Sequence, residues 1–166
     1  MTVRHDWLVQ LLAKLFRMAG ANVTIEPRVF DQERVRPDLD IIFPDCRLLV
    51  DVTVVNPASP SRTSRVQLAT AKTAEARKLA RYGDLARAHE SKFLAFAVEC
   101  FGGWGNEAVQ VIDLLKRKMA QLPPTVPSPS GEDVVRALAV SLQRGNCHVM
   151  NAGALATRAS QLIQQA

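Results

Sequence analysis

Apolar side chains recur along the chain with helical and strand-like spacings, and these spacings predict most of the secondary structure. From about His5 to Ala19, leucine and phenylalanine repeat at intervals of three and four residues, which predicts a helix that ends at Gly20. Short apolar and β-branched runs predict strands, and longer amphipathic runs predict helices. The expected strands are 23–29, 39–43, 48–55 and 92–101, and the expected later helices are 66–82, 106–121, 132–143 and 153–164.

The order of these elements predicts an α/β fold with a central sheet of about four strands flanked by helices. The segment 48–55 is apolar on both faces apart from two polar residues, which is typical of a central strand covered on both sides. We expect residues 1–121 to form the core domain. The Pro/Ser-rich stretch 122–131 is expected to be a loop or linker, and 132–166 a helical extension packed on or beside the core.

Composition narrows the class of protein only modestly. The 21 Lys and Arg residues against 16 Asp and Glu residues give a net charge of +5, which favours a polyanionic partner without requiring one. The three cysteines are scattered and form no CxxC pair, which argues against a structural zinc site and for reduced thiols inside a cell. No signal peptide or apolar run of membrane-spanning length is visible, so we expect an intracellular protein without a membrane partner.

Two carboxylates stand where strands are expected to be apolar. Asp38 opens one strand, and Asp51 lies in the middle of the next, where period two places it on one face with Leu49 and Thr53. A hairpin between these strands brings Asp38 and Asp51 together. Adjacent buried carboxylates repel each other and cost free energy to desolvate, and a hard divalent cation compensates both effects. The alternative is structural, with Asp38 capping a turn and Asp51 pairing with an arginine.

Pro37-Asp38, followed by Asp51-Val52-Thr53 after twelve intervening residues, resembles the signature of PD-(D/E)XK nucleases. The lysine that usually follows the second acid by two positions is replaced by Thr53. The sequence is more similar to one branch, the restriction-like endonuclease of site-specific non-LTR retrotransposons, in which the lysine comes from the following helix. Lys78-Leu-Ala-Arg81-Tyr82 resembles the Lys-x-x-Lys-Tyr element of that branch, and the likeness extends from about Arg4 to Met119.

The resemblance implies a restriction-endonuclease-like core with the order α-β-β-β-α-β and a mixed sheet. It implies a Mg²⁺- or Mn²⁺-dependent endodeoxyribonuclease that nicks duplex DNA, so that the nick primes reverse transcription. DNA is then the partner, and the chain is either a domain of a larger reverse-transcriptase polyprotein or a free-standing relative of such a domain. The resemblance implies a nuclear location if the element is eukaryotic. Two alternatives stay open: a nuclease fold that has lost catalysis and only binds nucleic acid, and a protein-interaction domain whose helical tail forms a homodimer.

The same resemblance suggests roles for individual residues. Asp38 and Asp51, with the carbonyl of Val52, are the expected metal ligands. Lys78 is expected to neutralise charge on the phosphate, with Lys72 as the rival lysine. Glu26 is the candidate for an additional catalytic acid, or else it forms a salt bridge with Arg28 or Arg36.

Further side chains are candidates for the same region. Asp40 is either a secondary metal ligand or a partner of Arg36, and His5 is a further site candidate. Tyr82 either contacts phosphate or packs against the sheet. Basic residues gather in sequence around the acidic pair, and phosphate contacts of this kind position a duplex without reading its bases. The expected DNA contacts are Arg36, Arg62, Arg65, Lys72, Arg81 and Tyr82.

Overall fold

The computed structural model describes residues 3–30, 36–58 and 68–164. Its strands form one mixed sheet of four strands in the order β1-β2-β3-β4, in which β1, β2 and β3 are antiparallel neighbours and β4 runs parallel to β3. The α/β class and the order α-β-β-β-α-β expected from the sequence are both present. The elements are α1 (Val3–Met18), β1 (Asn22–Ile25), β2 (Leu39–Ile42), β3 (Arg47–Val55), α2 (Ala69–Ala88), β4 (Lys92–Glu99), α3 (Asn106–Ala120) and α4 (Gly131–Gln164).

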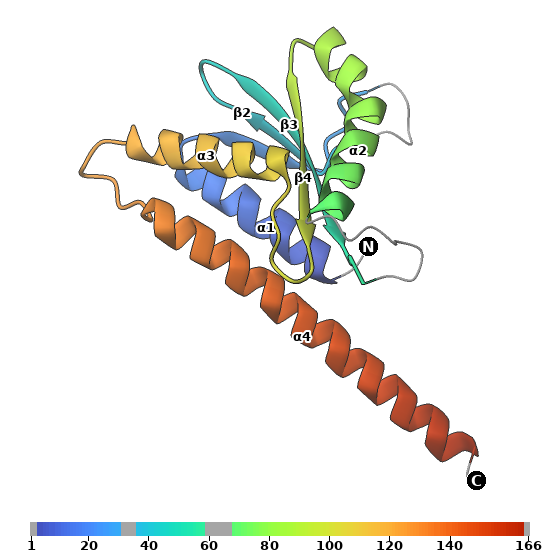
Figure 1. Ribbon diagram of the computed structural model, residues 1–166. Helices are drawn as coiled ribbons and strands as arrows, with labels where there is room; N and C mark the ends of the chain where they lie inside the picture. Colours follow the sequence, from blue (N-terminus) through green and yellow to red (C-terminus); the bar gives the residue numbers. More distant parts are fainter. Residues whose placement is uncertain (1–2, 31–35, 59–67, 165–166) are drawn as a thin grey trace.

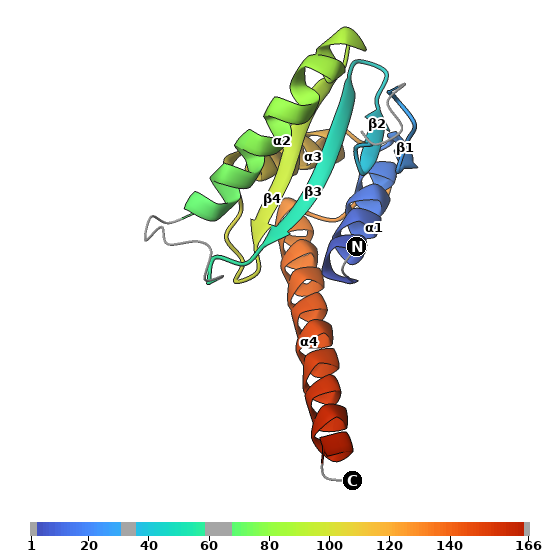
Figure 2. The same ribbon diagram turned by 90° about the vertical axis from the view of Figure 1, so that its right-hand side faces the viewer.

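Helices cover both faces of the sheet (Figures 1 and 2). Helix α2 lies on one face, while α1, α3 and the first half of α4 lie on the other. The alternation of side chains along β3 explains this arrangement, because Leu48, Val50 and Val52 belong to the large core beneath α1, α3 and α4. Leu49 points the other way, into the smaller cluster that it forms with Tyr82 of α2. Strand β3 is therefore central and covered on both sides, as its composition predicts.

Strand β1 is shorter than expected. The sequence predicts a strand over 23–29, but β1 ends at Ile25. Glu26 adopts a left-handed conformation with a φ of 49°, and Pro27 follows it without an N–H that could continue the ladder. Glu26 therefore lies beyond the end of the strand rather than in its middle.

Helix α4 is continuous from Gly131 to Gln164, so the prediction of two separate helices over 132–143 and 153–164 is wrong. Its first half belongs to the core, where Val134, Leu138 and Leu142 are completely buried at helical spacing. Gly145 lies where α4 crosses α1. A β-carbon at this position would lie 2.9 Å from the Cα of Arg4, so the close crossing requires glycine.

Asn146 anchors the middle of α4 on the core, and the ring of His148 lies 5.9 Å from that of Trp7 in α1. Its side-chain amide donates to the carbonyl of Cys100, and its Oδ1 accepts a hydrogen bond from Arg4. Beyond this point α4 projects away from the rest of the molecule (Figure 1), and the described side chains from Cys147 to Ala156 are exposed. Among the described residues, none of the helices combines the length and apolar character needed to cross a bilayer.

Candidate active site

The two carboxylates singled out in the sequence lie side by side at a fork between β2 and β3. The register pairs Leu39 with Val50, so continuing it by one residue places Asp38 opposite Asp51. Strand β3 continues to Val55 beyond this point, whereas β2 has begun only at Leu39. Asp38 is 6% exposed and Asp51 is 3% exposed, so the hairpin does bring two buried carboxylates together.

Asp38 is held by groups from two other elements. Its Oδ2 accepts a hydrogen bond of 2.6 Å from the backbone N–H of Val52, which lies on β3 past the last β2 pair. The same oxygen lies 3.1 Å from Nε2 of His5 in the first turn of α1. The capping alternative therefore describes part of the role of Asp38, although the N–H that it caps belongs to a strand and not to a turn.

His5 bridges two carboxylates, because its Nδ1 also lies 3.0 Å from Asp6. The hydrogen bond to Asp38 is the main reason that the pKa of His5 is raised to about 9. With a carboxylate at each ring nitrogen, both nitrogens act as donors and the ring is an imidazolium at neutral pH. A positive charge is thus held against Asp38.

Asp51 receives its positive charge from Lys78 of α2. The Nζ of Lys78 lies 2.7 Å from Oδ2 of Asp51, and the lysine side chain is 20% exposed. Burial, followed by the neighbouring Asp38, raises the pKa of Asp51, while Lys78 and Tyr82 act in the opposite direction. Within the described part of the chain, this buried Oδ2 receives no hydrogen bond of normal geometry in addition to the ion pair.

Tyr82 lies one turn after Lys78 and is part of the core. Its ring stacks on Phe93 with the centroids 5.0 Å apart, and its hydroxyl donates to the carbonyl of Arg36 at 3.0 Å. Tyr82 is 3% exposed, and burial raises its pKa to about 12. These contacts favour packing against the sheet over a contact with phosphate.

Other acids expected near the site lie elsewhere or have another partner. The side chain of Glu26 is exposed, and only its backbone N–H contacts the region, by donating to the carbonyl of Asp38 at 2.8 Å. Asp40 forms a bidentate pair with Arg47, at 3.0 and 2.9 Å, so its partner is not Arg36. Among the described residues there is no group of three or more His, Cys, Asp or Glu side chains that could hold a metal ion.

The basic residues expected to contact DNA are only partly described. Arg36, Lys72 and Arg81 have exposed side chains, and the guanidinium of Arg81 lies 5.5 Å from the Tyr82 ring centroid. Arg62 and Arg65 lie outside the described residues. Lys78, and not Lys72, makes the ion pair with Asp51.

Glu75 is a buried acid whose role was not anticipated. It lies on α2 one turn before Lys78, is 6% exposed, and accepts hydrogen bonds from the first backbone N–H groups of α3. The donors are Asn106, Glu107 and Ala108, at 3.2, 2.8 and 3.3 Å. A β-carbon on the adjacent Gly105 would lie 2.6 Å from Cδ of Glu75. This contact fixes α2, and with it Lys78, against the rest of the fold.

The fold and this cluster define the class of protein only coarsely: an α/β protein with a mixed four-stranded sheet and a buried Asp–Asp–Lys–His cluster at its fork. No protein-family model matches the chain, and the comparison with curated proteins finds no relative.

Proposed function

We propose that the chain is a metal-dependent endodeoxyribonuclease whose active site is the cluster of Asp38, Asp51 and Lys78. The observation that carries the proposal is the pair of adjacent, almost fully buried carboxylates with a lysine ammonium 2.7 Å from one of them. A pair of this kind costs free energy in the folded protein, and groups with a perturbed pKa, as burial raises the pKa of Asp51, gather at catalytic centres. The resemblance to the restriction-like endonucleases of retrotransposons supports the same reaction.

The donor set fits Mg²⁺ or Mn²⁺. Among the described residues, the buried Oδ2 of Asp51 has its ion pair with Lys78 but no hydrogen bond of normal geometry. Asp38 lies beside it, and the carbonyl of Val52 is the proposed third ligand. Mg²⁺ needs few protein carboxylates because it keeps several waters and binds substrate phosphate. When bound, the ion would polarise a phosphoryl oxygen and lower the pKa of a coordinated water.

The protein side chains have separate tasks in this proposal. Lys78 places an ammonium where negative charge develops on the phosphate, and its partial exposure leaves it within reach of a substrate. His5 holds the orientation of Asp38 through its hydrogen bond. The exposed Arg36, Lys72 and Arg81 supply contacts with DNA phosphates, which position the duplex.

A second candidate is a nuclease fold that binds nucleic acid without cutting it. The observation in its favour is that each carboxylate already has a cation, His5 beside Asp38 and Lys78 beside Asp51. Thr53, which replaces the lysine of the common nuclease motif on the strand itself, points the same way.

Nicking of supercoiled plasmid in Mg²⁺ or Mn²⁺ tests the first proposal, with EDTA as the blank. We expect Asp51→Asn and Lys78→Gln each to lower the rate at least about a hundredfold. Lys72→Gln is the matched control on the same helix, and it should weaken DNA binding while the rate at saturating DNA stays within about threefold. Absence of metal-dependent nicking together with salt-sensitive DNA binding would select the binding module instead.

A further inference from the structure

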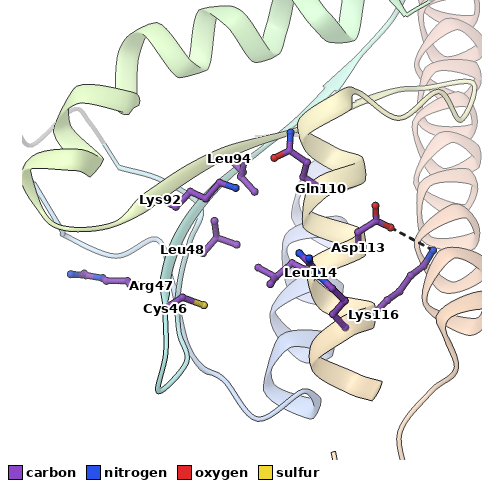
Figure 3. Close-up of a pocket in the computed structure, with 10 residues that line it drawn as sticks. Cys46, Arg47, Leu48, Lys92, Leu94, Gln110, Asp113, Leu114 and Lys116 are labelled. Carbon is purple, nitrogen blue, oxygen red and sulfur yellow. Dashed lines mark ion pairs between the residues drawn. The ribbon is translucent and has the colours of Figure 1, made fainter. Parts of the chain in front are cut away.

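A cavity of about 710 Å³ opens on the face of the sheet opposite Asp51 (Figure 3). Its walls come from the beginnings of β3 and β4 on one side and from α3 on the other. Leu48 and Leu94 point from the sheet toward Leu114 and Gln110 of α3. The volume is within the range of small-molecule sites, and the converging leucines make its interior apolar. Because Leu48 belongs to the core beneath α3, the cavity is separate from the carboxylate cluster.

The rim of this cavity is cationic. Four basic residues and one acidic residue line it, but Arg47 is paired with Asp40, and Lys116 lies 4.0 Å from Asp113. Lys92 and Arg117 form no ion pair with any carboxylate that the structure describes. Figure 3 shows Lys92 extending past Leu94 toward α3, so that its ammonium lies over the apolar wall. The basic side chains thus outnumber the acidic ones at the cavity, with Glu107 as a further carboxylate within electrostatic range of Lys92.

The edge of β4 adds a backbone donor beside the cavity. Farther along β4, backbone groups that point away from β3 are hydrogen-bonded: the N–H of Ala95 donates to Glu107, and the carbonyl of Ala97 accepts from Gly105. By the alternation of a strand, the N–H of Phe93 points to the same outer edge. Within the described residues it has no partner, and it lies between Lys92 and Leu94, which both line the cavity.

We propose that this cavity binds a small amphipathic anion. The anionic group, a carboxylate or a phosphate monoester, is held by Lys92 and Arg117, and the apolar part lies against Leu48, Leu94 and Leu114. Charge complementarity selects an anion over a neutral ligand, and the apolar wall selects an amphipathic ligand over a simple inorganic ion. The proposal is independent of the nuclease function, because none of these residues belongs to the carboxylate cluster.

Two naphthalene probes that differ in charge test the proposal. The full chain is titrated by fluorescence with the anionic 8-anilinonaphthalene-1-sulfonate and with the neutral N-phenyl-1-naphthylamine. The comparison separates the contribution of charge to the affinity from that of apolar contact. In Lys92→Gln/Arg117→Gln we expect the affinity for the anionic probe to fall about tenfold, as two partly exposed charge contacts predict. Binding of the neutral probe should change less than twofold, and Lys14→Gln, an exposed lysine on α1, should leave both affinities unchanged.

Amide chemical shifts locate the bound probe. We expect shifts at residues 92–95 and 110–117, and their loss in Leu114→Trp, which fills the cavity. Displacement by octanoate or by octyl phosphate then decides which anionic group the cavity takes. The proposal is overturned by the absence of binding at micromolar probe or by an affinity for the anionic probe that the double variant leaves unchanged. Shifts confined to the separate groove between Trp7 of α1 and residues 139–151 of α4 would also overturn it. Because both substitutions in the double variant lie on the surface of the rim, its circular dichroism should match that of the wild type.

Discussion

Replacement of Asp51 by asparagine should make the metal-free protein more stable. Asp51 is 3% exposed and adjacent to Asp38, and burial raises its pKa, with Asp38 as the next cause. The folded protein therefore binds the Asp51 proton more tightly than the unfolded chain, and keeping this group ionised at pH 7 costs stability. Asparagine keeps the shape of the side chain and removes the charge.

The size of the gain follows from what the substitution removes and what it leaves behind. Replacing a whole buried ion pair by neutral groups is neutral or stabilising by about 1–4 kcal/mol, whereas removing one partner costs about 3–5 kcal/mol when the charge left behind stays buried. Lys78 is 20% exposed, so its ammonium can reach water when Asp51 is neutral, and the loss of the ion pair offsets only part of the gain. We expect a net increase of about 1–2 kcal/mol, or roughly 3–6 °C in melting temperature for a chain of this size.

The stability gained by Asp51→Asn should increase with pH. Because the folded pKa of Asp51 lies above its unfolded value of about 3.9, the stability penalty of the wild type is absent below that value and grows as the pH rises. The advantage of Asp51→Asn should thus be full at pH 7 in EDTA and should disappear near pH 3. Added Mn²⁺ should stabilise the wild type alone and narrow the difference.

Asp40→Asn is the matched control. Asp40 is equally buried, on the same face of the neighbouring strand, but it forms a bidentate pair with Arg47. Its replacement should lower stability by about 1–2 kcal/mol, because it removes two charge-assisted hydrogen bonds, and because the residue opposite Asp40 is Leu49 and not a second carboxylate whose repulsion would be relieved. Urea denaturation measures whether each variant is more or less stable than the wild type. If Asp51→Asn lowers stability as much as Asp40→Asn, the carboxylate pair carries no desolvation penalty and the argument for a metal site fails.

Three further predictions concern other contacts. The raised pKa of His5 contributes about 3 kcal/mol that is fully present below pH 6.5 and lost as the pH rises to about 9. His5→Gln should abolish this loss, as denaturation at pH 6 and 9.5 would show. Gly105→Ala should displace Glu75 and cost about 1–3 kcal/mol, with faster hydrogen exchange at residues 106–108; unchanged exchange would contradict the capping role. A chain that ends at Asn151 should melt within about 2 °C of the full chain, because the described side chains after Asn146 are exposed; a larger drop would place the second half of α4 in the fold.

The local parts of the site could be predicted from the sequence because they depend on strand geometry alone. Period two assigns Asp51 and Leu49 to one face, and a tight connection between the two strands brings Asp38 alongside. The choice between Lys72 and Lys78 could not be made in this way. It depends on how α2 is rotated on the sheet, which Glu75 and its hydrogen bonds to α3 determine.

Other features depend on contacts between distant segments. The contact of His5 with Asp38 joins α1 to the fork, and no local spacing encodes it. The continuity of α4 is a similar case. A glycine within a helix costs about 1 kcal/mol relative to alanine, so Gly145 and Gly153 favour a break when the sequence is considered alone. At Gly145 the close approach of Arg4 of α1 overrides that local preference.

The position of Lys78 on a helix has a consequence for how the molecule folds. The two carboxylates lie on a β-meander whose strands are close in sequence, so the meander can form early, but at that stage the repulsion between Asp38 and Asp51 has no compensation from α2. Docking of α2 supplies the ammonium at the same moment as it covers Leu49 and Phe93 with Tyr82. The meander alone is therefore disfavoured, and its formation is coupled to the docking of α2. The acidic pair should thus make folding more cooperative and reduce the population of a meander that has formed without α2.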